Sequence, residues 1–174
     1  MEHRAATRTE GAVTVAGDTS ELPMSDNYLR LLPTDPSFVP SRAEASAALA
    51  ALASIAPGCE DVRAREEPEV TFVDAGSNFS AVRCPGCGAE LAIVPWWQGE
   101  LDRAHETRFE DLAVVSPCCH APTTLNELVY DWPQGFAKWW LEARNPRRGR
   151  LEPDELAELA AVVGCSLREV WTHL

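Results

Sequence analysis

Four cysteines in two clusters are the residues of this sequence whose types and spacing could do chemistry. Cys84 and Cys87 lie in the segment CPGCG, and Cys118 and Cys119 follow in SPCCH after 30 intervening residues. Two thiolates separated by two residues can bind one metal ion from a tight turn, and zinc prefers four such ligands in a tetrahedron. The proline and glycines of CPGCG favour that turn. We therefore expect one structural Zn²⁺ ion, bound by Cys84, Cys87, Cys118 and Cys119.

The segment from about residue 79 to 132 resembles the zinc ribbon family, in which two CPxCG-like knuckles on neighbouring hairpins bind one zinc ion. CPGCG matches the first knuckle in full. The second knuckle departs from the pattern, because Ser116 stands where the first cysteine is expected and Cys119 is in register with the second. The resemblance implies a zinc-bound module of two hairpins.

The fourth ligand is open between the two residues that flank Cys119. Cys118 can supply it if the backbone turns, because neighbouring Cα atoms are only about 3.8 Å apart. His120 has a longer side chain and is the alternate ligand. A redox-active pair is a weaker alternative, because a thioredoxin-like CxxC opens a helix and the glycine after Cys87 disfavours one. We expect Cys59 and Cys165 to be small apolar side chains.

A zinc-dependent enzyme of unknown reaction is one alternative function. Catalytic zinc keeps one position open for water and needs a carboxylate base nearby. The pair His105-Glu106 lacks the second histidine of HExxH, and PCCH lacks the PCxxC spacing of nucleobase deaminases. The sequence also has no phosphate-binding glycine loop and no GxSxG. These features favour a closed structural site in a non-enzymatic protein.

Length and charge limit the classes of protein. A chain of 174 residues with 45% hydrophobic residues is long enough for one domain with a real core. The N-terminus has no apolar stretch of the roughly 7 to 15 residues that a secretory signal needs, so we expect a cytoplasmic protein with reduced cysteines. The net charge of -12 argues against a protein that coats nucleic acid. It favours a protein partner with a basic surface.

The elements that position the cysteines follow from periodicity. We expect a disordered tail over residues 1–23 and a single α+β domain over 24–174, with the zinc ribbon inserted at about 79–132. Strands are expected at 28–32, 62–74, 79–83, 109–115 and 136–144, and helices at 41–55, 95–104, 153–163 and 166–174. Ser41 and Glu44 form a capping box. The elements predict a mixed or antiparallel sheet with helices on one face, and a ferredoxin-like arrangement is one that fits.

The C-terminal segment suggests a second alternative, which is nucleic-acid binding through the zinc ribbon or a helix-turn-helix. Residues 155–170 look like a helix-turn-helix, with small residues at the turn. The second helix would present Arg168, Glu169 and Thr172 outward, which is little positive charge for phosphate contacts. A protein-interaction role is therefore the main prediction.

The candidate partner-binding residues are aromatic or basic. The pairs at 96–97 and 139–140 place two tryptophans side by side, and neighbouring residues cannot both face the same side of one element. Exposed tryptophan and arginine dominate many interfaces. We expect the partner-binding residues to be Trp96, Trp140, Arg147, Arg148 and Arg150. The predicted function is that of a zinc-stabilised accessory, regulatory or immunity-type protein.

Overall fold

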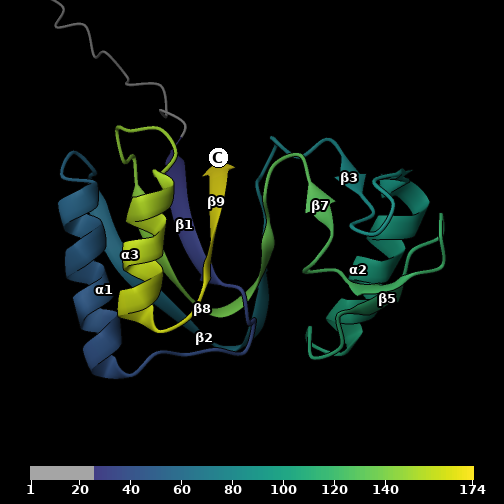
Figure 1. The fold of residues 1–174 in the computed structure, drawn as a ribbon, viewed down its shortest axis with the longest axis horizontal. Coiled ribbons are helices and arrows are strands. Elements are labelled where there is room, and N and C mark those ends of the chain that lie inside the picture. The colour runs from purple at the N-terminus through teal and green to yellow at the C-terminus, as the bar shows by residue number, and fades with distance from the viewer. Residues whose placement is uncertain (1–25) are drawn as a thin grey trace, which may run out of the picture.

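A four-stranded sheet with two helices and a smaller insert make up the fold in the computed structural model, which describes residues 26–174 (Figure 1). The predicted tail, residues 1–23, lies outside the described residues. The main sheet and its helices are β1 (Asn27–Pro33), α1 (Arg42–Ile55), β2 (Asp61–Val73), β8 (Gly135–Arg144), α3 (Pro153–Val163) and β9 (Leu167–His173). In this part of the chain, no helix combines the length and apolar character needed to cross a bilayer.

The main sheet has the strand order β2-β8-β1-β9, and every neighbouring pair is antiparallel. β1 and β2 are therefore parallel to each other, with β8 between them. Together with α1 and α3, this is the βαββαβ order of the ferredoxin-like arrangement. The α+β prediction, with helices on one face of the sheet, is confirmed.

Alternation along the strands explains which face the helices cover. Trp139 and Leu141 of β8 pack with Leu29 of β1 and with residues of both helices in one core. Helix α1 begins at the predicted capping box, in which the Glu44 carboxylate accepts from the Ser41 N–H at 2.7 Å. Cys59 and Cys165 are partly buried against the same core.

The opposite face of the sheet holds a buried carboxylate. Glu142 is 2% exposed and lies 2.8 Å from Arg30 Nε and 2.6 Å from Arg63 Nη2. Burial raises the pKa of Glu142, but hydrogen bonds from the two arginines outweigh it and lower that pKa below its usual value. Trp140 is also buried on this face, in a cluster with Val170. Trp140 is therefore not available as a surface anchor, and that prediction is wrong.

The C-terminal segment is a strand instead of the expected second helix. Residues from Leu167 to His173 pair with β1 along its whole length, and the Thr34 N–H donates to the Ser166 carbonyl at 2.8 Å. Leu167 and Val170 are buried from this strand. Ser166 and Glu169 have the spacing of a helix-capping pair, but pairing of this segment to the edge of β1 overrides that local preference. The helix-turn-helix prediction is wrong.

The insert comprises residues 74–134, between β2 and β8. Its elements are β3 (Val82–Arg83), β4 (Glu90–Leu91), the irregular helical turn η1 (Ile93–Trp97), α2 (Gln98–Glu106), β5 (Ala113–Val115), β6 (Pro122–Thr124) and β7 (Val129–Tyr130). The strands are shorter than predicted, and α2 begins three residues after Pro95. The insert sheets have the orders β4-β3-β7 and β5-β6.

The insert has its own aromatic core. Trp97 donates to the Tyr130 hydroxyl at 3.2 Å, and its ring packs against Phe79 and Phe72. Burial raises the pKa of Tyr130 to about 12. Phe72 of β2 and Phe136 of β8 belong to this core. The ends of two main-sheet strands thus anchor the insert.

Candidate metal centre

Two equivalent turns hold the cysteines. The first joins β3 to β4, where the Cys84 N–H donates to the Ala89 carbonyl at 2.9 Å. The second joins β5 to β6, where the Ser116 N–H donates to the Ala121 carbonyl at 3.0 Å. Each turn is closed by a second bond of 2.9 Å to the carbonyl of its first residue, from Gly88 N–H in one and from His120 N–H in the other. Ser116 therefore occupies the place of Cys84.

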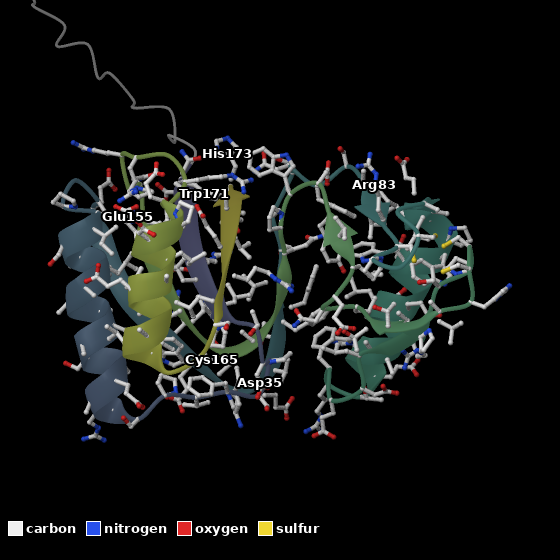
Figure 2. All side chains as sticks on the ribbon, viewed as in Figure 1. Asp35, Arg83, Glu155, Cys165, Trp171 and His173 are labelled. Carbon is white, nitrogen blue, oxygen red and sulfur yellow. The ribbon has the colours of Figure 1, made fainter. Side chains whose placement is uncertain are left out.

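The turns bring four sulfur atoms together. Cys84 Sγ lies 3.7 Å from Cys119 Sγ, and Cys87 Sγ lies 3.3 Å from Cys118 Sγ. All four sulfurs lie within 4.8 Å of one another. A tetrahedron of thiolates about 2.3 Å from a zinc ion has edges of about 3.8 Å. The cluster therefore has the dimensions of a metal site, at the end of the insert far from α1 and α3 (Figure 2).

Ser116 is joined to the cluster by its side chain. It is fully buried, and its hydroxyl lies 3.2 Å from Cys84 Sγ. This hydroxyl, followed by the N–H of Cys87, lowers the pKa of Cys84 to about 6. A serine at the place that Cys84 has in the first turn thus provides a donor that stabilises a neighbouring thiolate.

Two of the other thiols have raised pKa values, because the sulfur atoms lie close together. The contact with Cys87, followed by burial, raises the pKa of Cys118 to about 12. A hydrogen bond from the Ala121 N–H lowers the pKa of Cys119, but the contacts with Cys84 and Cys87 and partial desolvation together outweigh it, so that pKa is raised. Without a cation, like charges at these distances hold back ionisation, whereas a divalent cation favours all four thiolates.

His120, the alternate ligand, is not in the cluster of potential ligands. It has a φ of 59° and matches Gly88, whose φ is 74°. Cys118 corresponds to Gly86, and a Cβ built on Gly86 lies 3.8 Å from Cys119 Sγ. The position of Gly86 is thus one from which a side chain faces the sulfurs, and this explains how Cys118 joins them.

The five predicted partner-binding residues have different surroundings. Trp140 is buried, and Trp96 is partly buried against the insert core. Arg148 donates to the Ile55 carbonyl at 2.7 Å and forms an ion pair with Glu155, so it joins α1 to α3. Arg147 and Arg150 are exposed. The five residues do not form one surface.

Sequence reasoning missed two tryptophans that line a pocket. Trp132 is 37% exposed, and Trp171 belongs to the segment in which a helix was expected; neither was among the predicted partner-binding residues. LREVWTH does not alternate polar and apolar residues, so the signal for a strand was weak: a β-branched residue on either side of Trp171.

The chain matches no family model, no curated protein and no solved structure. The likeness to a zinc ribbon therefore rests on the two turns and their four cysteines.

Proposed function

We propose that the chain binds one structural Zn²⁺ ion through Cys84, Cys87, Cys118 and Cys119, and that the zinc-stabilised insert serves protein interaction. The sulfur cluster carries this proposal. Four soft thiolate ligands at tetrahedral spacing suit zinc or iron–sulfur chemistry, and not magnesium or calcium. Four protein ligands fill the zinc coordination shell, which suits a structural role and leaves no position for a catalytic water.

The turns that carry the cysteines have little other stabilisation. β3 and β4 have two residues each, and Cys87, Cys118 and Cys119 are exposed. Apolar burial at these turns is therefore small, and a metal ion that binds only the folded form supplies folding free energy. We expect the metal to be required for the order of the two turns, whereas the rest of the insert has its own aromatic core.

The interaction role follows from surface and charge. A net charge of -12 favours a partner with a basic surface, because complementary charge speeds association. An accessory, regulatory or immunity-type protein fits a small chain with a closed metal site. Salt-sensitive affinity for duplex DNA that is lost in Arg147→Ala and Arg150→Ala would contradict this role.

The experiment for the metal uses the full chain purified without added metal. Mass spectrometry should find about one zinc per chain. Cys84→Ser and Cys119→Ser should lose it, whereas Cys59→Ser should keep it, because Cys59 packs in the main core. Iron with visible absorption, or no metal in a chain with an ordered insert, would refute the zinc site.

A further inference from the structure

β9 is an edge strand with one unpaired side. Thr34 N–H donates to Ser166 O at 2.8 Å, and Leu174 N–H donates to Asp26 O at 3.0 Å. Bonded pairs alternate along an antiparallel ladder, so the even-numbered residues of β9 direct their backbone groups to β1. The odd-numbered residues Leu167, Glu169, Trp171 and His173 direct theirs away from the sheet.

Within residues 26–174, a single bridge pairs with this outer side. It joins Gly76 to His173 in parallel. Gly76 has a φ of 64°, and a Cβ there would lie 2.6 Å from the His173 carbonyl oxygen, so the close approach requires glycine. The bridge closes one end of the edge. The outward N–H and C=O groups of Leu167, Glu169 and Trp171 remain without a strand partner, over a length of about 17 Å.

Two pockets lie along this edge, with volumes of about 420 and 460 Å³. The first is lined by Trp171 of β9 and by Trp132 of the insert, and the second by Leu167 of β9 and Tyr130 of the insert. Arg150 lines both pockets. We call the two pockets together with the outer side of β9 the edge groove. One wall is the insert, and the other is the loop before α3.

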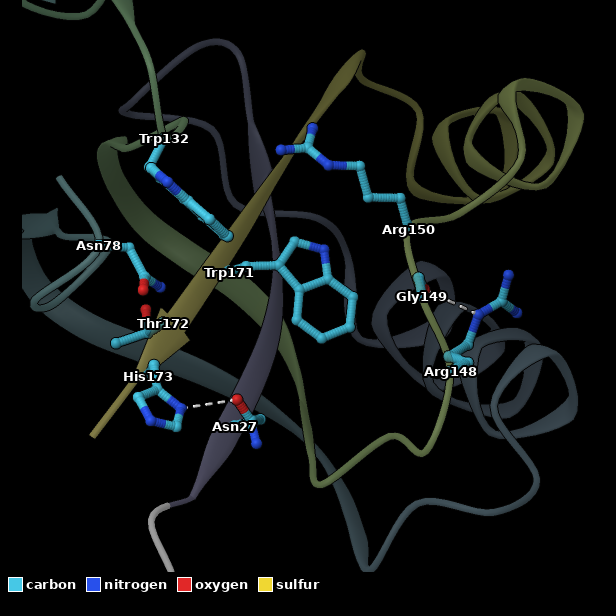
Figure 3. Close-up of a pocket in the computed structure, with 9 residues that line it drawn as sticks. All are labelled: Asn27, Asn78, Trp132, Arg148, Gly149, Arg150, Trp171, Thr172 and His173. Atoms are coloured by element: carbon cyan, nitrogen blue, oxygen red, sulfur yellow. Dashed lines mark hydrogen bonds between the residues drawn. The ribbon is translucent and has the colours of Figure 1, made fainter. Parts of the chain in front are cut away.

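The first pocket of the edge groove differs from the rest of this acidic chain in charge, whereas Glu169 lines the second. The first pocket has no carboxylate among its lining residues and includes Arg148, Arg150 and His173 (Figure 3). Glu155 already pairs with Arg148. Arg150 has no ion pair in the part of the chain that is described, and its side chain extends from the loop toward β9 (Figure 3).

We propose that the edge groove binds an extended peptide segment of a partner protein, which adds to β9 as a fifth strand of the main sheet. Unpaired N–H and C=O groups of an edge strand provide main-chain bonds, and pockets on the two sides of the strand select alternate side chains. The segment carries a carboxylate that pairs with Arg150 and an aromatic or aliphatic side chain that packs on Trp132 and Trp171. Because the insert forms one wall, the inference rests on the proposed zinc-stabilised interaction role and identifies its binding surface.

The length and register of the segment follow from the bridge. Gly76 blocks extension beyond Trp171, so about five residues of the partner pair with β9. A cationic pocket on an acidic chain gives specificity, because a basic peptide attracted by the overall charge finds no carboxylate in the first pocket.

The test selects peptides from a displayed library of random nine-residue sequences on the zinc-loaded full chain. We expect enrichment of sequences that alternate apolar and polar residues and contain a carboxylate. Trp132→Ala and Arg150→Ala should weaken binding of a selected synthetic peptide by at least about tenfold. Arg42→Ala is the matched control, because Arg42 is also exposed but lies at the start of α1. This variant should bind the peptide as tightly as the unchanged chain.

A second pair of variants tests the backbone bonds. Glu169→Pro removes an N–H that points away from β1, and proline is tolerated at such edge positions. It should abolish binding, while Glu169→Ala, which keeps the N–H, should still bind. Both variants lose the bonds from Trp171 Nε1–H and Leu151 N–H to the Glu169 carboxylate, so the difference in affinity between them measures the backbone N–H. Methylating alternate amide nitrogens of the peptide should have the same effect as Glu169→Pro. Hydrogen exchange should show new protection at Glu169 and Trp171, and none at Val170, which already faces β1.

The outcomes separate this inference from the zinc proposal. A chain without zinc refutes the proposed function before any peptide is tested. A zinc-loaded chain with an ordered insert that enriches no peptide refutes the edge groove alone. Peptides that bind Arg150→Ala and Glu169→Pro as well as the unchanged chain also refute it, because they must bind elsewhere.

Discussion

Ser116→Ala tests whether the serine at the second turn supports the metal site. The Ser116 hydroxyl lies 3.2 Å from Cys84 Sγ and is fully buried. Alanine has nearly the same volume, so the substitution removes the donor and little packing. We expect the chain to fold and to bind metal more weakly.

The size of the effect follows from the type of bond. A hydrogen bond to a charged group contributes about 1.5–3 kcal/mol. Since about 1.4 kcal/mol corresponds to a factor of ten, zinc affinity should fall by about 10- to 100-fold. Competition for zinc with a chromophoric chelator at pH 7 measures this ratio directly.

The control is Ser80→Ala, which removes a serine hydroxyl of the insert that bonds to Asp131 instead of to sulfur. It should leave zinc affinity within about threefold of the unchanged chain. Equal affinities for Ser116→Ala and the unchanged chain would refute the role of Ser116. A similar loss in both variants would indicate general loosening of the insert.

Three further substitutions test the fold and the ligand set. Glu142→Gln should cost about 2–4 kcal/mol in urea denaturation, less than a fully buried pair because water partly screens the arginines. The pKa of Glu142 in the folded chain is lowered, so the stabilisation that its carboxylate provides is complete above its ordinary pKa of about 4.5 and is lost as pH falls through the folded-state pKa. Between these two pKa values, Glu142→Gln should lose less stability on acidification than the unchanged chain. His120→Gly should keep one zinc per chain and raise the unfolding free energy by about 0.5–1 kcal/mol, because φ there is 59°; loss of zinc would identify His120 as a ligand. Gly164→Ala should lower thermal stability by about 1 kcal/mol, since the residue that ends α3 has a φ of 81°, and an unchanged melting temperature would contradict this.

Local signals predicted most of the main sheet because they agreed with tertiary packing. The capping box at Ser41, the alternation through Trp139 and the glycine after α3 each act within a few residues. β9 was mispredicted because Ser166 and Glu169 have the spacing of a helix-capping pair, and this local signal had a stronger competitor in β1, which lies 134 positions away in the pairing of Pro33 with Leu167. Sequence alone does not show which distant edge is free.

Spacing predicted the four cysteines of the candidate site, but it could not decide between Cys118 and His120. That choice depends on which residue of the second turn has a positive φ and which one faces the sulfurs. The Ala121 carbonyl fixes both, because its bond to Ser116 N–H aligns this turn with the first. The edge groove could not be predicted, since its walls come from the insert and from the loop before α3.

The connections of β3 link the metal centre to the edge groove. β3 ends directly before Cys84 and pairs with β4 on one side and with β7 on the other. Two residues after β7 lies Trp132, and the N–H of the residue between them, Asp131, donates to the Ala81 carbonyl at 3.1 Å. We therefore expect removal of the proposed zinc ion to loosen the strand that holds the insert wall of the groove. Peptide affinity should fall when zinc is chelated, even though no cysteine lines either of the two pockets of the groove.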